Sequence, residues 1–155
     1  MRMTVPQIAA SRTQRAVQDL IAAARSTQSD KVTWVPLGEA RTVLDQLTEC
    51  VIANLKWRSI LQTRRYADVS REVWEQIVAE CTTLPDTLAR LEQSGAELIA
   101  AIMAVPDEDT ADEIETPWER YTLADCCLHA YWNMVYHEGQ INYVQTLYGD
   151  MEEHY

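Results

Sequence analysis

Four polar side chains, spaced four residues apart near the end of the chain, have the residue types of a metal site. They are Asp125, His129, Asn133 and His137. In an α-helix this interval places side chains in one line along the surface. Aspartate and histidine bind metal ions well, whereas asparagine binds them weakly through its amide oxygen. The spacing therefore indicates a candidate metal site on a single helix.

The same helix also has an apolar face, into which His137 and Asn133 point. This face consists of Ala130, Met134, Ile141 and Val144. His129 falls at its edge, since each residue advances the helix by about 100°. A histidine on an apolar helix face is more often a hydrogen-bonded core residue than a metal ligand. This helix alone leaves both interpretations open.

A carboxylate on an expected helix at residues 39–63 is the next candidate. Its main apolar stripe is formed by Val43, Leu44, Leu47, Cys50, Val51, Asn54 and Leu61. Glu49 lies on a different face, which it shares with Ala53, Trp57 and Ile60. A helix with two partly apolar faces is expected to pack on both sides, which would leave Glu49 partly buried. A surface glutamate beside Lys56 fits the spacing equally well.

Apolar residues at helical spacing predict four main helices, and no segment predicts a β-strand. The expected helices cover residues 4–25, 39–63, 70–102 and 122–148. Within the third, Pro85 either kinks one long helix or opens a second one after a break. The acidic segment 107–115 is expected to be a solvated loop or a mobile crossing segment. The pattern predicts one all-α domain, residues 1–155, folded as a four-helix bundle.

Composition and charge restrict the function. The net charge of −11 argues against a nucleic-acid partner and against an anionic membrane surface. No apolar run approaches the length of a membrane span. The four cysteines, Cys50, Cys81, Cys126 and Cys127, form no C-x-x-C pair, so we expect reduced, buried thiols. With no signal peptide in view, the expected location is cytoplasmic.

Two segments resemble the DinB/YfiT-like superfamily. His129…Asn133…Tyr136-His137-Glu138-Gly139-Gln140-Ile141 is similar to its C-terminal signature, and Leu47-Thr-Glu49-Cys50-Val-Ile-Ala-Asn54 is similar to its second-helix motif. The segment Trp34-Val-Pro36 before that helix is also similar. The resemblance implies an up-down-down-up four-helix bundle, often a homodimer. It also implies a divalent metal held by three histidines, and in some relatives a thiol-dependent transferase activity.

The chain departs from that pattern at two of the three ligand positions. His137 is kept, whereas Glu49 stands at the first position and Asn133 at the middle one. Such a set favours harder ions (Mn, Fe or Mg) over Zn or Ni. His129, one turn earlier, is an alternative ligand. Equally, Glu49, Asn133 and His137 can hydrogen-bond one another with no metal present.

Two functions follow from these readings. The first is a metal-dependent transferase or hydrolase, in which Glu49 is a ligand or general base and Tyr136, Gln140 and Tyr143 support the site. The second is a metal-free, non-catalytic homodimer that has a structural role or binds a small ligand. DNA repair by direct contact with DNA is a third reading, suggested by the superfamily name alone, and the net charge opposes it.

Overall fold

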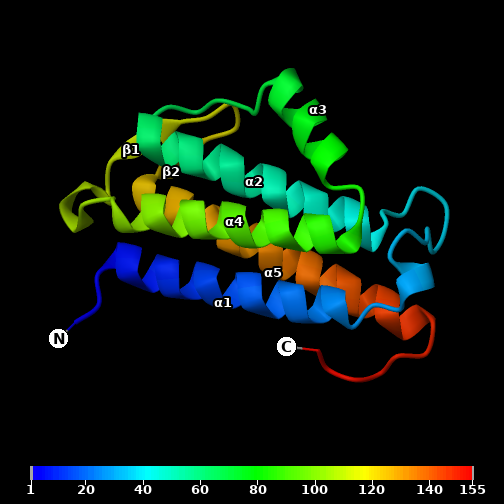
Figure 1. Cartoon of the computed structure of the whole chain (residues 1–155). Helices are drawn as coiled ribbons and strands as arrows, with labels where there is room; N and C mark the ends of the chain where they lie inside the picture. The colour runs from blue at the N-terminus through cyan, green and yellow to red at the C-terminus, as the bar shows by residue number, and fades with distance from the viewer. Residues whose placement is uncertain (1, 155) are drawn as a thin grey trace.

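The computed structural model describes residues 2–154 and is predominantly helical (Figure 1). Its α-helices are α1 (Val5–Arg25), α2 (Val43–Thr63), α3 (Arg71–Glu80), α4 (Leu84–Met103) and α5 (Leu123–Leu147). Short 3-10 turns cover Ser29–Lys31 and Asp107–Asp109, and the strands are β1 (Glu113–Glu115) and β2 (Arg120–Thr122). The predicted all-α class is confirmed. No helix among residues 2–154 is long and apolar enough to cross a membrane.

The long helices α1, α2, α4 and α5 pack around one core. Both α1 and α2 contact α4 on one side and α5 on the other, which closes a ring. In Figure 1, α1 and α5 run in one direction and α2 and α4 in the opposite one. Helices α2 and α5 are therefore antiparallel neighbours, and the middle of one lies against the middle of the other.

Threonine caps fix where these helices begin. The side chains of Thr4, Thr42 and Thr122 each accept a hydrogen bond from the backbone N–H three residues later. The side chain of that later residue accepts a hydrogen bond from the backbone N–H of the threonine. Such caps stabilise a helix by about 1 kcal/mol each. The cap at Thr42 explains why α2 begins at Val43, four residues later than expected. The predicted cap at Thr122 is confirmed.

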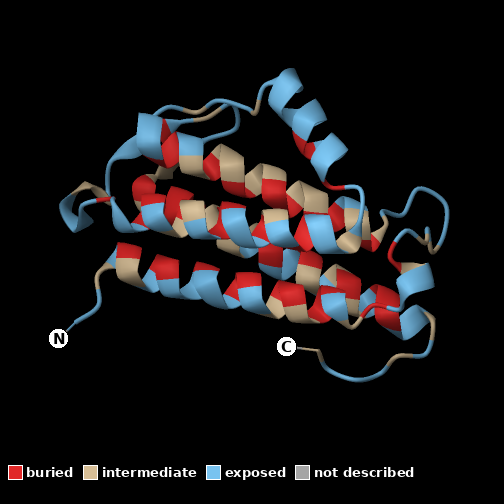
Figure 2. Cartoon of the chain, viewed as in Figure 1, coloured by how far each residue is buried: buried red, intermediate tan, exposed pale blue. Residues whose placement is uncertain are grey.

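Pro85 opens a new helix, which decides between the two alternatives for the third pattern. Helix α3 ends at Glu80, and α4 begins at Leu84 with Pro85 in its first turn. Proline is favoured there because its missing N–H would have had no helical partner. Ile77 is the buried residue of α3, so this helix lies outside the bundle against α2 (Figures 1 and 2).

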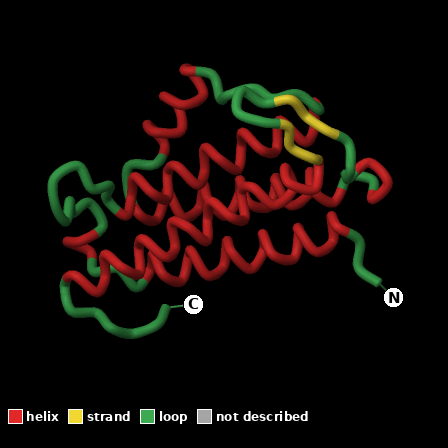
Figure 3. Tube along the Cα trace, turned by 180° about the vertical axis from the view of Figure 1, so that it is seen from behind, coloured by secondary structure: helices red, strands yellow, loops and turns green. Residues whose placement is uncertain are grey.

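The segment expected to contain no strand forms a short antiparallel hairpin. Ile114 of β1 pairs with Tyr121 of β2, at the end of the bundle where α5 begins (Figure 3). Ile114 is buried, while Glu113 and Glu115 on either side of it are exposed. Three residues are too few to show the period-two alternation that identifies a strand, so the prediction of a loop was wrong here.

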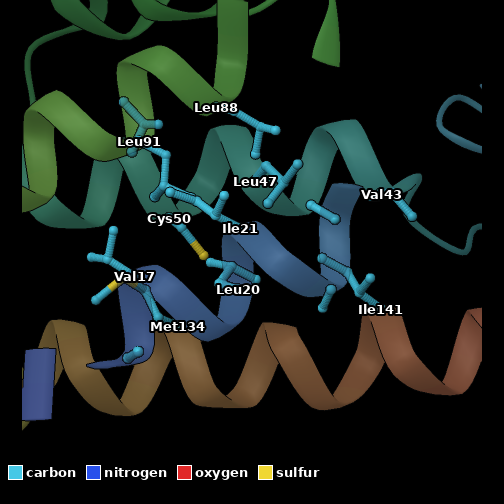
Figure 4. Packing of buried hydrophobic residues seen from close by; sticks show 14 of the residues in the cluster. Val17, Leu20, Ile21, Val43, Leu47, Cys50, Leu88, Leu91, Met134 and Ile141 are labelled. Carbon is cyan, nitrogen blue, oxygen red and sulfur yellow. The ribbon is translucent and has the colours of Figure 1, made fainter. Parts of the chain in front are cut away.

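The core consists of side chains from all the long helices. Leu20, Leu47, Leu91, Met134 and Ile141 meet in one buried cluster (Figure 4). The predicted burial of the cysteines is confirmed, and all are free thiols. Gly95 of α4 lies against α1, because a Cβ atom built on it would stand 2.7 Å from Cγ2 of Val17. Within this cluster Leu47 of α2 packs with Met134 and Ile141 of α5, close in sequence to Glu49 and His137.

Candidate functional site

Glu49 of α2 and His137 of α5 meet across the interface of these antiparallel helices. Oε1 of Glu49 lies 3.3 Å from Nε2 of His137. His137 is fully buried, as its position on the apolar face predicts, whereas the side chain of Glu49 keeps 40% of its surface exposed. The half-exposed carboxylate of Glu49 therefore lies between the buried imidazole of His137 and the solvent.

The tautomer of His137 follows from its other neighbour. Nδ1 of His137 lies 3.3 Å from Oε1 of the buried Gln46 side chain, one turn before Glu49 on α2. Because an amide oxygen only accepts, this contact favours the neutral tautomer with the hydrogen on Nδ1 and a lone pair on Nε2. Burial, and next the nearby charge of Arg41, lower the pKa of His137, while Gln140 opposes them. The neutral ring is thus favoured.

With a neutral ring, Nε2 of His137 and Oε1 of Glu49 are two hydrogen-bond acceptors placed close together. Nε2 of His137 has no hydrogen-bond partner among residues 2–154, although Oε1 of Glu49 is only 3.3 Å away. A buried acceptor without a partner costs about 1–3 kcal/mol. A cation or a proton placed between the two atoms would remove this cost.

Arg41 completes the surroundings of the carboxylate. Its Nη1 forms an ion pair with Oε2 of Glu49, and its side chain is 57% exposed. Arg41 stands in the connection before α2, just ahead of the Thr42 cap. Glu49 therefore contacts a guanidinium through one oxygen and the imidazole through the other.

Asn133 lies one helical turn before His137 and presents a further acceptor. Its Oδ1 is buried and has no hydrogen-bond partner within the described part of the chain. Asn133, Gln46 and Glu49 line the same pocket. An imidazole nitrogen and a carboxylate thus meet at the α2–α5 interface, and a buried amide oxygen lies one turn earlier on α5.

The pocket has a volume of about 1020 Å³ and a mixed lining. Its polar residues are Arg41, Gln46, Glu49, Asn133 and Gln140. Its apolar and aromatic walls include Leu37, Trp132, Tyr136, Tyr143 and Leu147. The rings of Trp132 and Tyr136 are stacked, with centroids 5.7 Å apart. The three residues predicted to support the site, Tyr136, Gln140 and Tyr143, all line this pocket.

A second pocket of about 520 Å³ lies between α2 and α3 and shares two lining residues with the first. Arg41 and Glu49 line it together with Trp74, Val78 and Cys81. The carboxylate of Glu49 therefore borders both pockets.

His129 and Asp125 have neighbours of a different kind. The His129 ring stacks on Trp57, with centroids 4.0 Å apart and planes 19° apart, and the edge of Tyr121 is also close. Burial lowers the pKa of His129. Asp125 accepts hydrogen bonds from Thr122 in the helix cap. The four residues of the predicted polar line therefore have separate environments. Asp125 belongs to the helix cap, His129 packs among aromatic rings, and Asn133 and His137 remain as candidate ligands.

The donor chemistry fits a hard divalent ion. No group of three or more His, Cys, Asp or Glu side chains in residues 2–154 is arranged to hold a metal. With Asn133 included, the available donors are Nε2 of His137, a carboxylate oxygen of Glu49 and Oδ1 of Asn133, and two of these atoms lack hydrogen-bond partners in the described structure. One nitrogen and two oxygens suit Mn, Fe or Mg better than Zn or Ni.

Two residues that contact the Glu49–His137 pair, and Trp132 in the pocket wall, were not identified from the sequence. Gln46 lies on the same side of α2 as Glu49, three residues earlier, so helical spacing offered a signal that was not used. Arg41 stands outside the helix, where no periodicity places a side chain.

Comparisons with known proteins agree with this fold. One solved structure, a histidine-to-alanine mutant of a mycothiol-dependent maleylpyruvate isomerase, superposes with a TM-score of 0.65 at 14% identity. The match covers 90% of this chain and 63% of that one. A comparison with curated proteins gives no match. The family model of the DinB superfamily matches residues 12–141, and the chain belongs to this superfamily.

Proposed function

We propose that this protein is a metal-dependent transferase or hydrolase of small molecules, with a site built on Glu49, Asn133 and His137. The observation that carries the proposal is the close approach of two acceptor atoms, Nε2 of His137 and Oε1 of Glu49, which lie 3.3 Å apart. Both atoms would be ligands of a divalent cation, and holding one would relieve this unfavourable contact. Oδ1 of Asn133, also without a hydrogen-bond partner in the described residues, is the third donor.

The residues of the chain divide the remaining tasks. Gln46 holds the hydrogen of His137 on Nδ1 and so keeps Nε2 available as a ligand. A bound divalent ion supplies Lewis acidity that favours deprotonation of a thiol or a water. Glu49 acts as a ligand in this arrangement and its other oxygen pairs with Arg41, so the released proton passes to solvent in the open pocket. Trp132 and Tyr136 form an exposed aromatic wall on one side of the pocket, which a bound substrate would cover.

The thiol part of the proposal is supported by one relative. The isomerase with the similar fold is mycothiol-dependent by its title. The identity of 14% and the coverage of 63% of its length support the shared fold alone. A thiol cosubstrate in the pocket of this chain is therefore our proposal, and we extend it to the homodimer that the superfamily resemblance implies.

Metal binding is tested on untagged protein purified without chelator. We expect bound Mn or Fe by elemental analysis, and a Tm that rises when Mn²⁺ is added to EDTA-treated protein. At 100 times Kd the stabilisation is about 2.7 kcal/mol, or roughly 5–10 °C for a domain of this size. His137→Ala should lose the rise, whereas His154→Ala, which changes a histidine paired with Asp150, should keep it. An unchanged Tm for the wild type with Mn²⁺, Fe²⁺, Ni²⁺, Zn²⁺ and Mg²⁺ would refute the proposal.

A second candidate is a metal-free bundle that binds a small ligand. It is favoured by the ion pair between Arg41 and Glu49, since the guanidinium already neutralises the carboxylate. In this case Arg41→Gln leaves Glu49 without its cation and destabilises the protein. If Arg41→Gln instead strengthens Mn²⁺ binding, the guanidinium and the metal compete for the same carboxylate, as the first proposal requires.

A further inference from the structure

The pocket beside Glu49 combines one guanidinium with an aromatic wall. Arg41 is the cationic side chain of its lining, and Trp132, Tyr136 and Tyr143 are exposed aromatic residues of α5 that form the wall. Solvent-exposed aromatic surface is unfavourable in water unless it is covered by a ligand or a partner. The lining therefore has an apolar part that a flat organic group would cover.

Arg41 has donors left over for a ligand. Its contact with Glu49 uses Nη1, whereas a guanidinium carries five N–H donors. One guanidinium can therefore bind Glu49 and a second acid group at the same time. The side chain is 57% exposed, so a ligand reaches it without unfolding of α2.

The charge balance also favours an acid group. Glu49 and Arg41 neutralise each other, and a divalent cation bound to Glu49 would leave Arg41 and the metal as neighbouring positive charges. A single anion placed beside Arg41 relieves that repulsion.

We infer that this pocket takes a small organic acid with a flat apolar body, whose acid group pairs with Arg41 and whose body lies on Trp132 and Tyr136. This inference rests on the proposed function, because it names the substrate class of the same site. Arg41 is then the residue that selects a charged substrate over a neutral one of equal shape.

The test compares two compounds of the same shape, 2-naphthoate and its neutral amide 2-naphthamide. Binding is measured by calorimetry at low salt on EDTA-treated protein with no metal added. We expect naphthoate to bind about ten-fold more tightly, about 1.4 kcal/mol, because the free N–H donors of Arg41 form charge-assisted hydrogen bonds with the carboxylate and weaker ones with the neutral amide. In nitrogen–proton NMR spectra, the indole N–H of Trp132 and the backbone N–H of Gly139 should shift on binding, because both residues line the pocket.

Variants separate the charge from the wall. Arg41→Gln should remove the ten-fold preference for naphthoate, and Trp132→Ala should weaken the binding of both compounds by a similar factor. The control Arg120→Gln changes an exposed arginine that pairs with Glu113 on the hairpin, and it should leave both affinities unchanged. Circular dichroism confirms that each variant is folded. Equal affinity for acid and amide, retention of the preference in Arg41→Gln, or no binding of either compound overturns the inference. Because neither metal nor turnover is involved, this test and the metal test can fail independently.

Discussion

Nε2 of His137 lies 3.3 Å from Oε1 of Glu49, while Nδ1 of the same ring lies 3.3 Å from Oε1 of Gln46. The ring is thus held between two oxygen acceptors and has one hydrogen to give while it is neutral. The predictions below depend on which atom lacks a partner and on what would supply one.

Replacing Glu49 by Gln should not destabilise the metal-free protein, and should stabilise it by up to about 1 kcal/mol, because the new amide donates to Nε2 of His137. The same change should abolish stabilisation by Mn²⁺. Urea unfolding with and without Mn²⁺ measures both effects. Glu97→Gln, which changes another carboxylate paired with an arginine, should lose at most about 1 kcal/mol and keep the response to Mn²⁺. If Glu49→Gln alone loses more than about 1 kcal/mol, an imidazolium–carboxylate pair was the stabilising state.

Replacing Gln46 by Leu should cost about 1–3 kcal/mol, because Nδ1–H of His137 is left buried without an acceptor. The ring should then change its tautomer, which the nitrogen chemical shifts of the imidazole report. Gln145→Leu is the matched control, since this buried glutamine donates to the carbonyl oxygen of Ala23 and to Thr27. It should be destabilising too, but leave the imidazole shifts of His137 unchanged. Unchanged shifts in Gln46→Leu would contradict the assigned tautomer.

Stability should fall as the pH drops below about 6.5, the ordinary pKa of histidine. Burial and the charge of Arg41 lower the pKa of His137 in the folded state, and burial lowers that of His129. Below the unfolded pKa the unfolded chain binds protons that the folded chain does not, so the free energy of unfolding decreases until the folded pKa is reached. Urea midpoints at pH 7.5 and 5.5 should therefore differ less in His137→Gln than in the wild type. Equal differences in the two proteins would show that His137 does not contribute.

Adding a methyl group should have opposite effects at two helical glycines. Gly95→Ala should cost about 1–3 kcal/mol, because its Cβ would stand 2.7 Å from Cγ2 of the buried Val17. Gly139→Ala should instead stabilise by up to about 1 kcal/mol, since nothing lies within 4 Å of its Cβ position and alanine is the better helix former. Thermal unfolding measures both. In the double variant Gly95→Ala with Val17→Ala the clash is gone, so the penalty of Gly95→Ala measured in the Val17→Ala background should largely disappear.

The helices of the bundle were predictable because their signals are local. Apolar residues at helical spacing and the threonines at Thr4 and Thr122 gave the first and last helices closely. The pattern also pointed His137 into the core, where the structure has it. Helix α2 begins later than its apolar pattern suggested, and a new helix begins at Leu84, because capping residues rather than apolar spacing set these two helix starts.

The surroundings of the candidate site were less predictable, because they depend on contacts between distant segments. Spacing alone put His129 in line with His137, but stacking on Trp57 gives that ring a different environment. Arg41 reaches Glu49 from an irregular connection whose path only the folded chain defines. The hairpin around Ile114 is similarly set by pairing across a turn rather than by its own three residues.

Helix α3 is a ten-residue segment with Ile77 as its buried residue, and it covers the pocket behind Glu49. Segments with few buried contacts detach at a lower free energy than the core to which they are attached. Transient release of α3 would therefore hydrate the rear of the carboxylate while the surrounding helices stay intact. The rate at which water and small solutes exchange at Glu49 then reflects the local attachment of one short helix, and it can be altered at Trp74 or Val78 without weakening the bundle.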